Sequence, residues 1–238
     1  MKISTPHFDR IPGPPARRGL VREALGLLEP VRLAARLPRL ARHPRGEGRP
    51  LLVLPGFGAS DQSTWILRQY LAWLGYVVDG WGLGRNTGRV PQLIPRIIDR
   101  LENISQHHGD RVGLVGWSLG GYLAREAARE RPDLVSRVVT LGSPVVGGPK
   151  YTLASRHYKR NGFDLDEIEA SVAARDEVPL ETPVTAIFSK RDGIVAWQAC
   201  IDRINTSTEH VEVRATHIGL GMNPDVFAIV ADRLARRG

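Results

Sequence analysis

Residues 112–121 read VGLVGWSLGG, in which an apolar run passes directly into the pattern Gly-x-Ser-x-Gly centred on Ser118. The Ala-, Arg- and Glu-rich residues 122–131 follow and favour a helix. A serine on so sharp a strand-to-helix turn has a strained backbone, and only glycine at positions 116 and 120 lets the neighbouring chain pass without a Cβ clash. The pattern predicts that Ser118 projects above a sheet, at a helix N-terminus whose dipole favours negative charge, as a candidate nucleophile.

A reactive serine needs a base that takes its proton and a third group that orients the base. Downstream, the strand-like residues 184–188 lead to Asp192, and Gly193 eases the turn that follows it. A second strand-like segment at 210–213 leads to His217, in an expected loop before the last helix. These positions make Asp192 the candidate acid and His217 the candidate base.

Other acids and histidines fit these two roles less well. Asp-Gly is also a common turn dipeptide, so Asp192 has a purely structural alternative. The rival acids lie in a polar stretch with no strand before it, namely Asp166, Asp176 and Glu177. Four of the other histidines lie in the basic N-terminal region or in an evident turn, namely His7, His43, His107 and His108.

The order Ser118, Asp192, His217 resembles that of the α/β-hydrolase superfamily, in its lipase/esterase branch, from about Pro50 onward. A fourth element agrees, because the apolar residues 51–54 run into PGFGAS at 55–60, which resembles the family's oxyanion loop. The resemblance implies that the backbone N–H groups of Phe57 and Leu119 would stabilise an oxyanion. Pro55-Gly56 stands where other members have His-Gly. The alternative to an oxyanion loop at 55–60 is a plain turn between a strand and a helix.

The remaining pattern fits a doubly wound, mostly parallel sheet with the α/β-hydrolase fold. Strand-like runs at 75–78 and 135–141 alternate with helical periodicity at 62–74, 91–107 and 225–236, as expected for βαβ units. We expect a basic, partly helical arm over residues 1–48 and a catalytic domain over 49–238. Its short insertion at about 147–181 would form the small helical cap that the resemblance implies.

Four apolar residues near the expected site are candidates for an acyl pocket: Phe57, Trp81, Trp117 and Leu119. Each has ordinary core packing as its alternative. No cofactor is expected, because the glycine-rich residues 82–86 lack the dinucleotide spacing. No metal site is expected either, since the single cysteine, Cys200, provides no ligand cluster.

The net charge of +8 is concentrated at the N-terminus. Residues 1–50 hold eleven basic and four acidic residues, a net charge of +7, which leaves +1 for the other 188. Leucines recur near helical spacing in segments 20–28 and 31–41, with arginines between them. Such an arm could pack on the body or on a second copy in a homodimer, or lie on an anionic membrane. Nucleic acid is not expected as a partner, because no motif accompanies the charge.

The sequence thus indicates a serine carboxylic-ester hydrolase that cleaves small-molecule or lipid esters with apolar acyl chains of short to medium length, through an acyl-enzyme. The alternatives are an acyltransferase or thioesterase with the same residues, and a non-catalytic binding protein with a hydrolase fold. Without a membrane-spanning or signal-like apolar run, we expect a cytoplasmic location, with the arm as a means of peripheral membrane contact.

Overall fold

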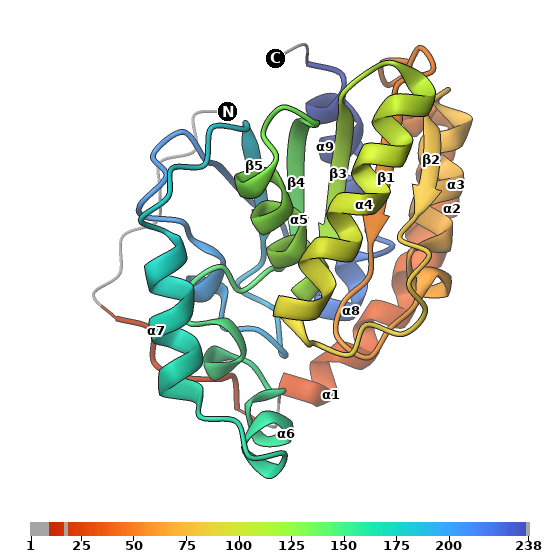
Figure 1. The fold of residues 1–238 in the computed structure, drawn as a ribbon. Coiled ribbons are helices and arrows are strands. Elements are labelled where there is room, and N and C mark those ends of the chain that lie inside the picture. Colours follow the sequence, from red (N-terminus) through yellow and green to blue (C-terminus); the bar gives the residue numbers. More distant parts are fainter. Residues whose placement is uncertain (1–9, 17–18, 237–238) are drawn as a thin grey trace.

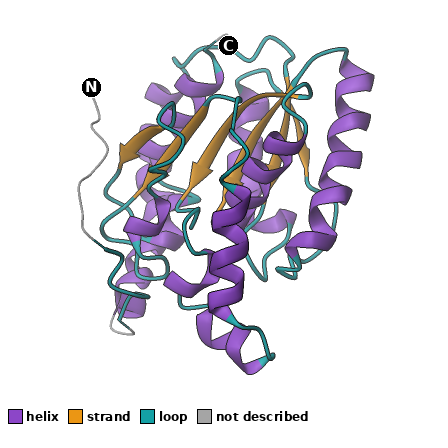
Figure 2. Cartoon of the chain, turned by 60° about the vertical axis from the view of Figure 1, so that its left-hand side comes forward, coloured by secondary structure: helices purple, strands orange, loops and turns teal. Residues whose placement is uncertain are grey.

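A computed structural model describes residues 10–16 and 19–236. A six-stranded sheet forms the centre of the molecule, with helices on both faces (Figures 1 and 2). Every strand pairing is parallel and the order is β2-β1-β3-β4-β5-β6. The strands are β1 (Pro50–Leu54), β2 (Val77–Gly80), β3 (Val112–Trp117), β4 (Val135–Leu141), β5 (Val184–Phe188) and β6 (Glu209–Glu212). The predicted doubly wound sheet is confirmed.

Alternation along the strands divides the core into two layers. In β1, Leu51 and Val53 pack into one layer, whereas Leu52 and Leu54 pack into the other. The first layer lies under α2 (Glu29–Leu40), α3 (Trp65–Trp73) and α9 (Pro224–Leu234), and the second lies under α4 (Val90–His108) and α5 (Leu119–Glu130). Both faces of the sheet are therefore covered, which explains why its central strands are apolar throughout.

Local signals fix where these helices begin and end. The side chain of Asn223 accepts hydrogen bonds from two N–H groups at the start of α9, and α4 ends at Gly109 in the left-handed conformation. The predicted strand at 75–78 begins two residues late, because Gly75 has a φ of 88° and belongs to the preceding turn. His217, expected in a loop, is instead the first residue of the short helix α8 (His217–Leu220), which Thr216 caps.

The segment between β4 and β5 forms the small helical cap. It contains η3 (Gly148–Tyr151), α6 (Ser155–Arg160) and α7 (Leu165–Arg175). In Figure 1 these elements lie beyond the carboxyl ends of the strands, on the lower left of the molecule. Two further short helices, η2 (Asp61–Thr64) and η4 (Trp197–Cys200), follow β1 and β5.

The arm packs on the body through α1 (Gly19–Glu23), η1 (Ala24–Leu28) and α2. Leu33 and Leu40 of α2 are buried in the same layer as α9. Arg36 forms an ion pair with Asp225 of α9 at 2.9 Å. The leucines at helical spacing in residues 20–28 do not pack on the body. They are exposed to solvent.

Among the helices of the described residues, none is both long and apolar enough to span a membrane.

The burial of Leu33 generates a stability prediction. Leu33→Ala should lower the free energy of unfolding by about 2–5 kcal/mol, as truncation of a core leucine does. Leu37→Ala, in the same helix but at a residue that is 44% exposed, should cost less than about 1 kcal/mol. Urea unfolding measures both changes. Equal, small losses in the two variants would mean that the arm is not part of the folded core.

Candidate active site

The candidate site lies where the order of the strands reverses. From β1 the chain moves outward to β2, then returns to the other side of β1 to form β3. The loops that leave β1 and β3 therefore diverge at the carboxyl edge of the sheet, which is where open α/β sheets bind ligands. The loop after β1 carries Gly56 and Phe57, and the turn after β3 carries Ser118.

Ser118 sits in the predicted strand-to-helix turn, with φ 55° and ψ −123°. Glycines on either side permit this conformation. A Cβ at position 116 would lie 2.4 Å from the carbonyl oxygen of Gly120, and one at position 120 would lie 2.3 Å from that of Leu54. Ser118 also precedes α5 directly, so its side chain lies at the N-terminus of that helix.

His217 and Asp192 are brought together by the loops that follow β6 and β5. The Nδ1 atom of His217 lies 2.6 Å from Oδ2 of Asp192. The second carboxylate oxygen, Oδ1, accepts hydrogen bonds from the N–H groups of Ile194 at 2.8 Å and Val195 at 2.7 Å. The carboxylate is thereby held in one orientation, and its other oxygen is directed at the imidazole.

A further carboxylate, Glu23 of α1, ties these two loops together. Its Oε1 accepts from the N–H of Gly193 at 2.8 Å and from that of His217 at 3.1 Å. Its Oε2 accepts from the N–H of Ile218 at 2.8 Å. One side chain of the arm therefore bonds to both the acid loop and the histidine loop.

The sequence did not identify Glu23, because it lies 170 to 195 residues before its partners in a region whose main feature is positive charge. The only available signal was an acidic residue among arginines.

The two carboxylates determine the electrostatics of the imidazole. Burial of the ring lowers the pKa of His217, but the charge and hydrogen bond of Asp192 and the charge of Glu23 outweigh it, so the pKa is raised. Burial, with a contribution from Asp192, also raises the pKa of the Cys200 thiol well above its usual range. The cysteine is thus a neutral core residue beside the site.

The predicted oxyanion donors lie beside Ser118. Ser118, Phe57, Leu119 and His217 all line one pocket. The loop after β1 passes directly against the serine, because a Cβ on Gly56 would lie 3.2 Å from that of Ser118. Within residues 10–16 and 19–236, no group accepts a hydrogen bond from the backbone N–H of Phe57 or of Leu119.

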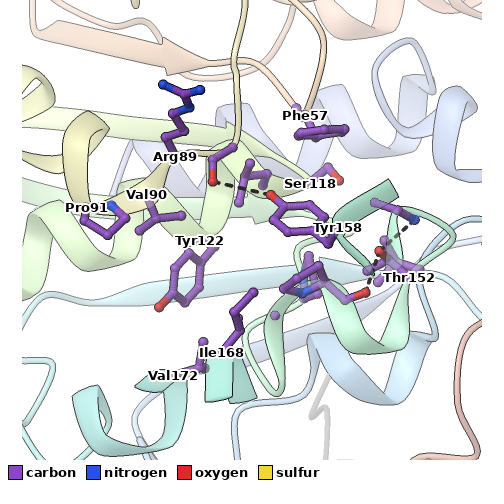
Figure 3. Close-up of a pocket in the computed structure, with 18 of the residues that line it drawn as sticks. Phe57, Arg89, Val90, Pro91, Ser118, Tyr122, Thr152, Tyr158, Ile168 and Val172 are labelled. Atoms are coloured by element: carbon purple, nitrogen blue, oxygen red, sulfur yellow. Dashed lines mark hydrogen bonds between the residues drawn. The ribbon is translucent and has the colours of Figure 1, made fainter. Parts of the chain in front are cut away.

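The pocket has a volume of about 940 Å³ and runs from Ser118 between the start of α4 and the cap helix α7 (Figure 3). That volume is near the upper end of the roughly 300–1,000 Å³ of small-molecule sites. Beyond Ser118 the walls are mostly apolar and include Val90, Ile94, Tyr122, Ile168 and Val172.

Of the four predicted pocket residues, Phe57, Trp117 and Leu119 line this space, but Trp81 does not. Trp81 is fully buried in the core layer under α4, and its indole N–H donates to the carbonyl of Gly84 at 2.9 Å. The loop after β2 folds the ring inward, so the structure shows the ordinary core packing that was the alternative for Trp81.

The cap contacts the loop that carries Phe57. The centroid of the Phe57 ring lies 5.3 Å from the centroid of the His157 ring and 5.6 Å from that of the Tyr158 ring, and both of these residues are in α6. The Tyr158 hydroxyl donates to the carbonyl of Gly88 at 3.4 Å, as Figure 3 shows. The candidate oxyanion loop is therefore packed against the cap by aromatic contacts.

Comparisons with known proteins agree with this fold. A family model described as alpha/beta hydrolase fold matches residues 49–159. The structure of the mature Bacillus licheniformis lipase BlEst2 superposes with a TM-score of 0.63 at 17% identity, over 81% of this chain and 94% of that one. A structure from work on the metagenome-derived lipolytic enzymes LipS and LipT gives 0.61 at 17% identity, over 80% and 93%.

The thioesterase domain from the curacin biosynthetic pathway gives a TM-score of 0.53 at 16% identity, over 82% of this chain and 92% of that one. A search of curated protein sequences gives no match. At these identities the structural similarity establishes the fold.

The surroundings of His217 generate a prediction that needs no substrate. Its imidazole should titrate above the usual pKa of about 6.5, and Glu23→Gln should lower that pKa because one of two negative charges that stabilise the imidazolium is removed. Imidazole NMR titration, with His217→Gln to assign the signal, measures the change.

Glu29→Gln is the matched control, because Glu29 is a buried arm carboxylate bonded instead to Arg32 and Asn223. The same decrease in both variants would contradict a direct effect of Glu23.

Proposed function

Because this chain has the α/β-hydrolase fold and its residues 49–159 match that family's model, we propose that it is a serine carboxylic-ester hydrolase of the lipase/esterase type, cleaving apolar acyl esters. One observation carries the proposal. A serine in a strained strand-to-helix turn shares a pocket with an imidazole that is bonded to a buried carboxylate.

In the proposed first step, Nε2 of His217 takes the proton of the Ser118 hydroxyl while Oγ attacks the carbonyl carbon of the ester. The imidazolium that forms keeps its Nδ1–H directed at Asp192, which stabilises the positive charge. General base catalysis of this kind contributes about 10²–10⁴ to the rate. Glu23 adds a second negative charge near the same ring.

The negative charge that develops on the carbonyl oxygen needs donors that are already in place. The N–H groups of Phe57 and Leu119 are proposed to supply them, and each such donor contributes about 10²–10³ to the rate. His217 then returns its proton to the departing alcohol, which leaves an acyl-enzyme on Ser118. Water activated by the same imidazole releases the carboxylic acid and restores the serine.

The walls of the pocket support an apolar acyl chain as the specificity element. From Ser118 the space continues along Val90, Ile94, Ile168 and Val172, where a hydrocarbon chain would be removed from water. Each buried methylene contributes about 0.8 kcal/mol to binding. Since the same machinery serves thioesters, a thioesterase is the second candidate, consistent with the curacin thioesterase domain among the similar structures.

The proposed mechanism is tested with p-nitrophenyl esters of increasing acyl length and with acyl-CoA substrates. Ser118→Ala should abolish turnover, and Asp192→Asn should lower kcat by about 10⁴, because the histidine loses its orienting charge. Circular dichroism verifies that both variants fold. Undiminished hydrolysis by Ser118→Ala would refute the serine mechanism, whereas turnover confined to CoA esters would favour the thioesterase.

The acyl pocket yields a separate specificity prediction. Ile168→Trp should shift the preferred ester to shorter chains, because the larger side chain fills the space beside Val172, with little change in kcat for the shortest ester. Val178→Trp, on an exposed position outside the pocket, is the control. If the chain-length profile of Ile168→Trp matched that of the control, the acyl chain would have to bind elsewhere.

A further inference from the structure

The N-terminal helices α1 and η1, together with the first residues of α2, are amphipathic in the opposite sense to an ordinary surface helix. The side turned to the protein carries small and acidic residues, namely Gly19, Glu23, Gly26 and Glu29. The side turned to solvent carries apolar residues that are 49% to 78% exposed. We call these the apolar face: Leu20, Val21, Leu25, Leu27, Leu28 and Val31.

Close contacts prevent this segment from turning its leucines inward. A Cβ on Gly19 would lie 3.1 Å from the Cα of Gly193, and a Cβ on Gly26 would lie 2.7 Å from the Thr216 hydroxyl oxygen. Glu23, between them, accepts hydrogen bonds from three backbone N–H groups of the body. Only small side chains and this carboxylate fit the inner side, so the apolar face stays in solvent at a cost in free energy.

The charge that accompanies the apolar face has one sign. Exposed arginines continue from it along α2 to the following turn, and the two acidic residues of the segment 19–42 point inward. Among the described residues, three of these arginines have no ion-pair partner, namely Arg22, Arg39 and Arg42. A segment that carries exposed apolar side chains and unpaired cations matches the interface of an anionic bilayer, where both kinds of group are satisfied.

From these observations we propose that the apolar face and the arginines Arg22, Arg39 and Arg42 form a docking surface for anionic lipid. A second copy of the chain fits less well. In a two-fold dimer each patch meets itself, so arginines would approach arginines with no exposed carboxylate in the segment to pair with them. Nucleic acid would satisfy the charge but leave the apolar side chains in water.

The apolar face of this docking surface lies at the catalytic edge of the sheet, and α2 runs from there to Arg39 and Arg42. Both α1 and η1 contact α8, the helix that begins at His217. Ile218, the next residue, is 37% exposed. Figure 1 shows α1 at the same lower end of the molecule as α6 and α8. A bound lipid surface would therefore lie beside the pocket of Ser118, although the docking itself does not depend on the proposed hydrolysis.

The test is co-sedimentation of the full chain with vesicles of phosphatidylcholine alone or mixed with phosphatidylglycerol. Arg22→Gln, Arg39→Gln and Arg42→Gln together should weaken binding to the mixed vesicles about a hundredfold, since each cation near the surface contributes about fivefold. Val21→Ser, Leu25→Ser and Leu28→Ser together should weaken it by at least as much, because each buried side chain contributes roughly tenfold or more.

The matched control replaces two exposed apolar residues elsewhere, Val178→Ser and Ile204→Ser, and should bind like the wild type. Thermal unfolding verifies that all variants fold. The proposal is overturned if the wild type does not bind the mixed vesicles, or if both patch variants bind as the control does. A dimer would also overturn it. In that case the wild type would not bind lipid but would dimerise with increasing concentration in sedimentation equilibrium, and the variant with Val21→Ser, Leu25→Ser and Leu28→Ser would stay monomeric.

Discussion

The close approach of α5 to β1 and β3 is the constraint on which the site depends. The backbones at Gly116, Gly120 and Leu54 lie so close together that a Cβ on either glycine would overlap a carbonyl oxygen. The crossing forces Ser118 into a conformation that costs about 1–3 kcal/mol for a residue with a Cβ. The surrounding packing sustains it, and the N–H of Ser118 is held by the carbonyl of Leu141 at 2.8 Å. The position of the Ser118 Cβ, which carries the hydroxyl, is thus set by the backbone.

The charge of the His217 imidazole depends on two buried carboxylates, those of Asp192 and Glu23. Burying a carboxylate is unfavourable unless donors replace its hydration. Here the donors are backbone N–H groups: Ile194 and Val195 for Asp192, and Gly193, His217 and Ile218 for Glu23. Both charges are therefore fixed before any reaction. In the proposed mechanism they stabilise the imidazolium only after it has taken the serine proton.

The sequence predicted the elements whose signals are local. The strands at 135–141 and 184–188 have the predicted bounds, since an apolar run flanked by turn residues identifies a buried parallel strand. The meeting of Asp192 with His217 also follows from strand order, because both come after neighbouring strands. The catalytic roles of these residues, and those of Phe57 and Leu119, stay predictions.

What the sequence did not reveal depends on which way an element faces. Helical periodicity groups Leu20, Leu25 and Leu28 on one side but does not say whether that side meets the body. The structure turns it outward, because the contact with the loops of β5 and β6 is too close for leucine. Glu23 was missed for the same reason, since its partners are backbone groups that leave no pattern in the sequence.

The contact between Gly19 and Gly193 has a consequence for sequence variation. Each glycine occupies the place where the other's side chain would be, with a Cβ on Gly193 lying 2.5 Å from the carbonyl oxygen of Gly19. Two positions 174 residues apart should therefore vary together among relatives. Relatives that keep the arm should carry glycine at both, whereas relatives that lost it are free to place a side chain after the acid. The covariation of this one pair would record the gain or loss of the arm.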